Sequence, residues 1–191
     1  MGISVGRALE SLGVQDDVIN VALLVFPGDS FEPLIEVVRD AAATPPKTSR
    51  ILGEVPPMIG VGLTSHTLIR MRQLLSLGPA SFPQFTRDYV RRCCDIIEIA
   101  LKQFALDRSI VSANDRRPLG ALISLLEKKK ELSTSLAKNL KAYNARIYVR
   151  AKHEVTRAVG SQMFNVSDAA VITIVAMKLG DWIDHQYRYE V

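Results

Sequence analysis

Aromatic residues and cysteines are both scarce in this sequence, and each shortage limits what the protein is. Aromatic side chains make up 6% of the 191 residues, with a single Trp. A β-sandwich core and a stacking platform for single-stranded nucleic acid both use many aromatic residues, so the composition disfavours both. The two cysteines, Cys93 and Cys94, are neighbours, which rarely form a disulfide on a helix. We therefore expect two reduced thiols packed in the core.

Long apolar runs and metal-binding motifs are also missing, and no signal peptide is expected. The most apolar windows, residues 18–26 and 169–179, are too short to span a bilayer. The start, MGISVGRALE, lacks the features of a signal peptide, and Gly6 stands where N-myristoylation needs Ser or Thr. No Cys/His spacing suits a metal, and no glycine-rich loop suits a nucleotide. We therefore predict a cytoplasmic protein without membrane contact, metal or cofactor, and the kinase and dinucleotide-binding classes are disfavoured.

Apolar residues at helical spacing are what the sequence has in quantity. Hydrophobic residues make up 48% of the chain, enough for a packed core. Their spacing predicts an all-α helical bundle, with an N-terminal helical extension over residues 1–80 and the bundle over 81–191. The predicted helices of the extension are 5–26, 31–43 and 64–77, with a proline-rich loop at 44–57. The predicted helices of the bundle are about 84–106, 118–130, 133–155 and 167–186.

Several residues mark the expected helix ends. Pro118 suits the first turn of a helix, and Ser133 is a typical N-cap. Ser167 is predicted to cap the last helix, with Asp168 at the positive end of its dipole. These positions support the boundaries that the apolar pattern gives.

The charge of the chain is modest in total but unevenly distributed. The formal net charge is +4, which permits contact with nucleic acid without requiring it. Residues 137–157 hold seven basic side chains, counting His153, against one acid, Glu154. The sequence therefore predicts that a site for an anionic ligand, if the protein has one, lies in this segment.

One face of the predicted helix 133–155 gathers residues suited to phosphodiester chemistry. Seven residues along an α-helix return to within about 20° of the starting direction, so Arg146 and His153 share a face. Histidine can take a proton from a ribose 2′-hydroxyl, and arginine binds phosphate with a planar fork of donors. We identify Arg146 and His153 as candidate catalytic residues. Tyr143, Arg150 and Lys152 are candidate RNA-binding residues. The alternative is an ordinary solvated helix end, where cations favour the dipole.

The segment RPLGALISLLEKKKELSTSLAKNLKAYNARIYVRAKH, residues 117–153, resembles the middle of HEPN domains, a family of helical bundles. It shares a Leu-Gly at the start of one helix, a second helix, and then an Arg followed by a His. The last helix, SDAAVITIVAMKLGDWID, is similar to the closing helix of that family, so the resemblance covers roughly residues 84–190. The HEPN signature is an Arg, four to six residues and a His. Arg146 and His153 fit it with six residues between them.

This resemblance implies a function and leaves an alternative open. In ribonuclease members of the family, the Arg and His of two protomers meet at a dimer cleft and cut RNA without a metal. The expectation is a homodimeric endoribonuclease in a defence or toxin–antitoxin role, with Arg146 on the phosphate and His153 as acid or base. Those members usually have a polar residue after the Arg, where this chain has Ile147. Other HEPN proteins are not nucleases, so a non-catalytic helical module that binds a protein partner is the alternative.

The resemblance also implies a neighbour for the Arg/His helix. In the HEPN layout the helix at 84–106 packs beside it. Asp95 or Glu98 of that helix would then lie close enough to orient His153.

Overall fold

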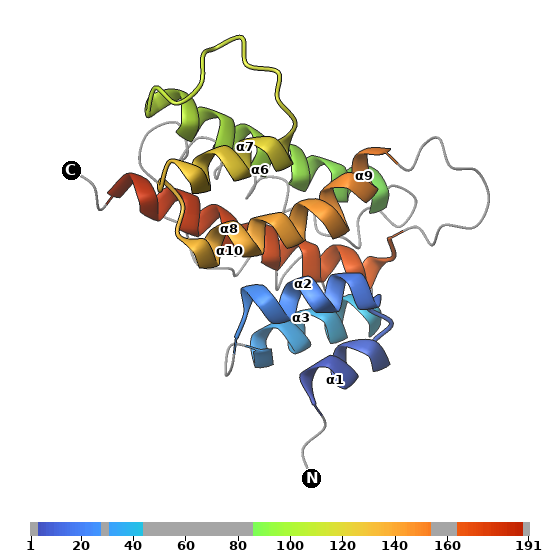
Figure 1. Ribbon diagram of the computed structural model, residues 1–191. Coiled ribbons are helices and arrows are strands. Elements are labelled where there is room, and N and C mark those ends of the chain that lie inside the picture. The colour runs from blue at the N-terminus through green and yellow to red at the C-terminus, as the bar shows by residue number, and fades with distance from the viewer. Residues whose placement is uncertain (1–3, 28–30, 44–85, 154–163, 189–191) are drawn as a thin grey trace.

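The computed structural model describes residues 4–27, 31–43, 86–153 and 164–188. The elements in these ranges are α1 (Val5–Ser11), α2 (Asp16–Val25), α3 (Glu32–Ala43), α6 (Thr86–Asp107), α7 (Leu119–Lys128), α8 (Thr134–Tyr143), the π-helix η3 (Asn144–Tyr148), α9 (Val149–His153) and α10 (Val166–Arg188). No strand occurs in the described ranges, so the predicted all-α fold class is confirmed (Figure 1).

The central helix of the fold is α10, because a nine-residue stretch of its sequence leaves no polar face. The run AAVITIVAM, residues 169–177, contains no charged side chain, and nearly all of it is buried. A helix that is apolar on every side needs neighbours on every side. Accordingly, α6 packs against one side of α10, and α2 and α3 pack against another (Figure 1).

The N-terminal segment differs from the prediction in one respect. The single helix expected at 5–26 is two helices, α1 and α2, separated by a turn. Gly13 in this turn has a φ of +81°, a conformation that residues with side chains rarely adopt. The prediction was wrong because the apolar spacing continues on both sides of the turn and hides the break.

The four helices predicted for the C-terminal part are confirmed, with ends that shift by a few residues. α7 and α8 are neighbours joined by a short turn, and α6 contacts α7, α9 and α10. Ser133 caps α8, since its side chain accepts a hydrogen bond from the backbone N–H of Leu136 at 3.2 Å. Pro118 lies directly before the first residue of α7.

Of the remaining predictions for the first half of the chain, one is confirmed and the others fall on residues outside the described ranges. The helix at 31–43 is confirmed as α3. The predicted loop at 44–57, the helix at 64–77 and the boundary near residue 80 lie outside the described residues. The described N-terminal helices contribute to the same hydrophobic core as the later ones. Within the described ranges, no helix is both long enough and apolar enough to cross a membrane.

Candidate functional site

The stretch that carries the candidate residues is one continuous helical segment with a π-turn inside it. α8 passes into η3 and then into α9. At the end of η3 the backbone N–H of Val149 donates to the carbonyl of Asn144, five residues earlier. A π-turn holds more residues than an α-turn, so positions before and after η3 do not keep the α-helical phase assumed above. The regular spacing from which Arg146 and His153 were predicted to share a face is therefore interrupted by η3.

The π-turn begins beside the first turn of α7, where a glycine leaves room for it. A Cβ on Gly120 would lie 3.0 Å from Nδ2 of Asn144, a separation that forces a neighbour to move. Gly120 therefore permits a close approach between α7 and the start of η3. This gives a physical role to the Leu119-Gly120 pair at the start of α7.

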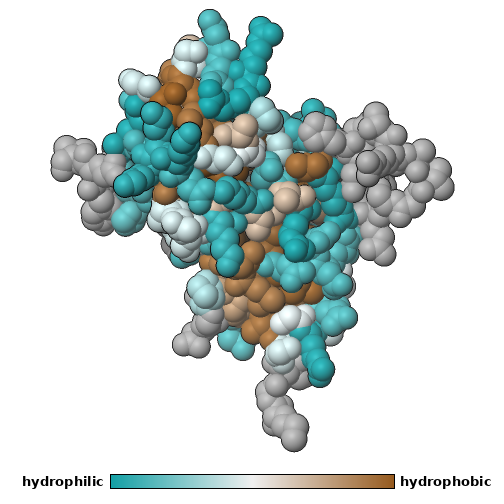
Figure 2. Space-filling view, viewed as in Figure 1, coloured by the Kyte–Doolittle hydropathy of each residue, from teal (hydrophilic) through white to brown (hydrophobic). Residues whose placement is uncertain are grey.

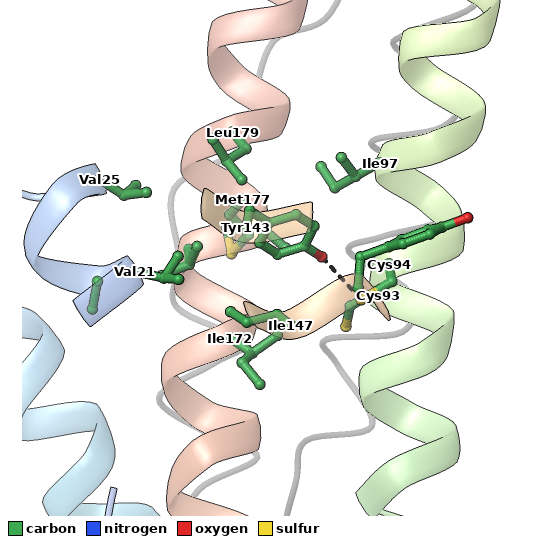
Figure 3. Packing of buried hydrophobic residues seen from close by; sticks show 14 of the residues in the cluster. Val21, Val25, Cys93, Cys94, Ile97, Tyr143, Ile147, Ile172, Met177 and Leu179 are labelled. Carbon is green, nitrogen blue, oxygen red and sulfur yellow. Dashed lines mark hydrogen bonds between the residues drawn. The ribbon is translucent and has the colours of Figure 1, made fainter. Parts of the chain in front are cut away.

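Tyr143 is in the core, which corrects its prediction as an RNA-binding residue. Its side chain is fully buried, and its hydroxyl donates to Sγ of Cys94 at 3.2 Å (Figure 3). A buried ring cannot stack on a base, so Tyr143 stabilises the contact between α8 and α6 instead. Cys93 and Cys94 are both buried and unpaired with each other, and burial raises the pKa of the Cys94 thiol to about 12. Their prediction as core residues is confirmed.

Arg146 is the most exposed of the predicted cations that the structure describes. Its side chain is 43% exposed, and Nη1 donates to Oδ1 of Asp17 at 2.8 Å. Asp17 comes from the first turn of α2 and is itself 52% exposed. Among the described residues this is the one polar contact of the guanidinium, so the described part of the protein leaves its other N–H donors unused. Ion pairs of this exposure contribute about 0–1 kcal/mol to stability.

Arg150 is held against two elements that are distant in sequence. Its Nη2 donates to the side-chain oxygen of Gln15, and its guanidinium lies 4.2 Å from the ring centre of Phe164. Gln15 in turn donates its backbone N–H to Oδ1 of Asp168 at 2.8 Å. Arg150 therefore joins the turn before α2 to the start of α10.

The start of α10 is capped by Asn165. The prediction of Ser167 as the cap was therefore wrong. Oδ1 of Asn165 accepts the backbone N–H of Asp168 at 2.8 Å, and Oδ2 of Asp168 accepts that of Asn165 at 2.9 Å. This reciprocal pair satisfies two donors at once. Burial raises the pKa of the Asp168 carboxyl, although both backbone hydrogen bonds and Arg150 act in the opposite direction. Asp168 lies in the first turn, as expected.

Lys152 points toward α6 and is enclosed by acids. Its Nζ lies 2.6 Å from Glu98 and 3.1 Å from Asp95. Glu98 also accepts hydrogen bonds from Lys102 and from the hydroxyl of Tyr148. Burial acts to raise the pKa of Glu98, but the hydrogen bonds from Lys102, Lys152 and Tyr148 outweigh it and lower that pKa to about 2. Lys152 therefore joins α9 to α6, and a phosphate would have to compete with two carboxylates for its ammonium group.

His153 is the last residue of α9, and its side chain lies outside the described part of the structure. The expected packing of α6 beside α9 is confirmed. The two acids of α6, Asp95 and Glu98, bind the residue before His153. Ile147, the residue directly after Arg146, is fully buried. A polar side chain at that position would face the core, which accounts for the isoleucine.

The described residues around this site offer no metal-binding cluster, and a pocket in the described part of the chain does not involve the predicted site residues. No group of three or more His, Cys, Asp or Glu residues there is arranged to hold a metal ion. A pocket of about 230 Å³ lies between α6, the loop after it and α7, and Ile99 and Leu122 are among the residues that line it. None of the predicted site residues lines this pocket.

The partners of the arginines are what sequence reasoning missed. Gln15 and Asp17 lie more than 120 residues from the side chains that they bind, and no local spacing points to them.

No protein-family model matches this chain, and no curated protein or solved structure matches it either.

Proposed function

We propose that this protein is a HEPN-like endoribonuclease that needs no metal, with Arg146 binding the scissile phosphate and His153 acting as acid or base. The observation that carries the proposal is the exposure of Arg146. Its guanidinium is held by one weak surface ion pair and keeps donors available for a phosphate. The resemblance in Arg146 and His153 supplies the reaction class.

The proposed reaction is cleavage of RNA by its own 2′-hydroxyl. His153 takes the proton of that hydroxyl, the oxygen attacks phosphorus, and the 5′-oxygen of the next nucleotide leaves with a proton from an acid. Arg146 stabilises the negative charge that grows on the phosphate oxygens. The HEPN resemblance places the two residues of neighbouring protomers together, so the proposed active form is a homodimer.

Asp17 opposes this reaction in the resting molecule. Its carboxylate occupies part of the fork that a phosphate would use. An RNA phosphate must displace it, at a cost of about 0–1 kcal/mol for an exposed pair. Removing the charge of Asp17 is therefore expected to increase both RNA binding and cleavage.

The test is incubation of the purified protein with a labelled mixed RNA in EDTA, beside four variants. We expect Asp17→Asn to cleave several-fold faster than the parent. Asp16→Asn, the matched control at the exposed neighbouring acid, is expected to cleave at the parental rate. Arg146→Ala should lower the rate by about 10²-fold, and His153→Ala by 10² to 10⁴-fold, roughly the ranges for a lost charge stabiliser and a lost acid or base. Equal cleavage by His153→Ala and the parent would place the chemistry elsewhere.

A second function is favoured by a different observation. Arg150 and Lys152 both contact internal partners, so two of the cations predicted to bind RNA stabilise the fold instead. A non-catalytic helical module that binds a protein partner needs no free cations at these positions. If neither the parent nor Asp17→Asn cleaves RNA or binds it, this second function is the one to pursue.

A further inference from the structure

The positive charge of this protein is concentrated in one hairpin of helices. Residues 127–146, from the end of α7 to the middle of η3, hold six basic and two acidic side chains. The whole chain has 24 basic and 20 acidic residues, so the remainder has 18 of each sign. The formal net charge of +4 therefore resides in this hairpin alone.

The lysines of the hairpin lie on its outer surface. Lys128, Lys129 and Lys130 end α7 and begin the turn, and Lys138 is one turn into α8; all four are exposed. We call these four residues the lysine surface. For none of them does the described part of the chain record an ion pair, in contrast to Lys141, which pairs with Glu127. Hydrophilic side chains cover this side of the molecule where α7 passes into α8 (Figure 2).

Two contacts show how the two helices of this hairpin run relative to each other. Gly120 lies against Asn144, and Glu127 pairs with Lys141. Positions later in α7 thus face earlier positions of α8, so the two helices run antiparallel and the end of α7 lies beside the start of α8. Lys138 and Arg146 are eight residues apart, about 12 Å along a helix. Exposed cations therefore recur from the turn to the candidate catalytic residue.

We propose that the lysine surface binds the RNA backbone on one side of the scissile phosphate and guides the strand to Arg146. This inference rests on the proposed function, because it extends the substrate path of that site. Lysines bind phosphates as point charges without selecting a base, so the surface adds affinity and little sequence preference. The bound strand would cover several phosphates, since phosphates of one strand are roughly 3.4 Å apart along a duplex axis.

RNA fits this surface better than a membrane does. Protein surfaces that bind anionic lipids usually combine cations with large apolar side chains that enter the bilayer. The large apolar side chains exposed in the described part of the chain are Leu23, Ile99 and Val149. None of them belongs to the hairpin of residues 127–146.

The test separates binding from cleavage by using a 2′-O-methyl oligonucleotide, which lacks the attacking hydroxyl. Binding is measured by fluorescence anisotropy at several salt concentrations. The variant is Lys128→Gln/Lys138→Gln, and the matched control is Arg91→Gln/Arg92→Gln, which removes two exposed charges from α6. The lysine variant should bind several-fold more weakly, and its salt slope should fall by about 1.4, or 0.7 for each lost phosphate contact with a single strand. The α6 control should retain the parental slope.

Three results would overturn the inference. If the parent binds, Arg146→Ala weakens binding and the lysine variant does not, the lysine surface is not on the path, while the proposed function stands. An equal loss in the α6 control would assign the effect to net charge alone. If the parent does not bind the oligonucleotide at all, the proposed function fails together with the inference. Binding to phosphatidylserine vesicles in that last case, lost in the lysine variant, would identify a membrane surface as the ligand.

Discussion

The two ends of the segment formed by η3 and α9 carry cations of the same kind in opposite circumstances. Arg146, in η3, is 43% exposed and has one exposed acid as its described polar partner. Lys152, near the end of α9, is 25% exposed and lies between two acids of α6, of which Glu98 is 13% exposed. Two cations that look alike in the sequence thus have different roles. Lys152 forms a structural ion pair, and Arg146 faces solvent.

The difference follows from what each residue faces. Lys152 is directed at the long helix α6, where the carboxylate of Glu98 is only 13% exposed and would lose one of its partners. Arg146 is directed at the exposed first turn of α2, where water already solvates both charges. The free energy that each contact contributes to folding is therefore expected to decrease from Lys152 to Arg146, while availability to a ligand increases.

The largest effect is expected for Lys152→Met. This change leaves Glu98 and Asp95 without their common partner, and a poorly compensated, partly buried charge costs about 2 kcal/mol. Urea unfolding measures the loss. Lys102→Met is the matched control, because Lys102 also binds Glu98 but is 41% exposed, and its loss should be less than half as large. Equal losses in the free energy of unfolding would show that the lower exposure of Lys152 does not make its ion pairs more stabilising.

The second effect is on acid stability. Glu98 has a pKa of about 2 in the folded protein, below the roughly 4.3 of an unperturbed glutamate. Its ionised form therefore stabilises the fold fully above pH ~4.3, and this contribution is lost as the pH falls through about 2. Burial raises the pKa of Asp168, so that group has the opposite sign and favours the fold as the pH falls.

Comparing the parent with Glu98→Gln isolates the first of these contributions. The gap in free energy of unfolding between the two proteins should narrow as the pH is lowered from 5 toward 2, whereas Asp168 affects both equally. A gap that stays constant over this range would mean that Glu98 is not the group whose charge matters.

A smaller effect is expected for Arg150→Ala, which removes the contacts with Gln15 and Phe164. A cation over an aromatic ring contributes roughly 0.5–1 kcal/mol when exposed and more when desolvated, so a loss of about 1 kcal/mol is expected by urea unfolding. Arg108→Ala is the matched control, since Arg108 lies 5.5 Å from the ring centre of Phe104 rather than 4.2 Å. A larger loss at Arg108 would contradict the importance of the shorter contact.

The helices of the bundle could be predicted because their information is local. Apolar residues recur at helical spacing, and a cap such as Ser133 lies three residues from the N–H that it binds. Two local features were still hidden. Gly13 ends α1 inside an unbroken apolar pattern, and η3 shifts the helical phase in a way that no 3.6-residue periodicity reveals.

The candidate site was harder to predict because its partners are distant in sequence. Asp17 lies 129 residues before Arg146, and Glu98 lies 54 residues before Lys152. The prediction of Tyr143 as an RNA-binding residue failed for a related reason, since its ring packs in the core while Arg146, three residues later, is exposed. Sequence spacing indicates which residues share a helix, but the neighbouring elements decide what each one faces.

The smallest effect on stability, and the one that best separates structure from function, is expected at Arg146. Arg146→Ala and Asp17→Asn should each change the free energy of unfolding by less than about 0.5 kcal/mol, and a double-mutant cycle should give a coupling no larger than that. The same two changes should move RNA binding in opposite directions, because one removes the phosphate contact and the other removes its competitor. A coupling above about 1 kcal/mol would make Arg146 structural, like Lys152, and would remove the observation on which the proposed ribonuclease depends.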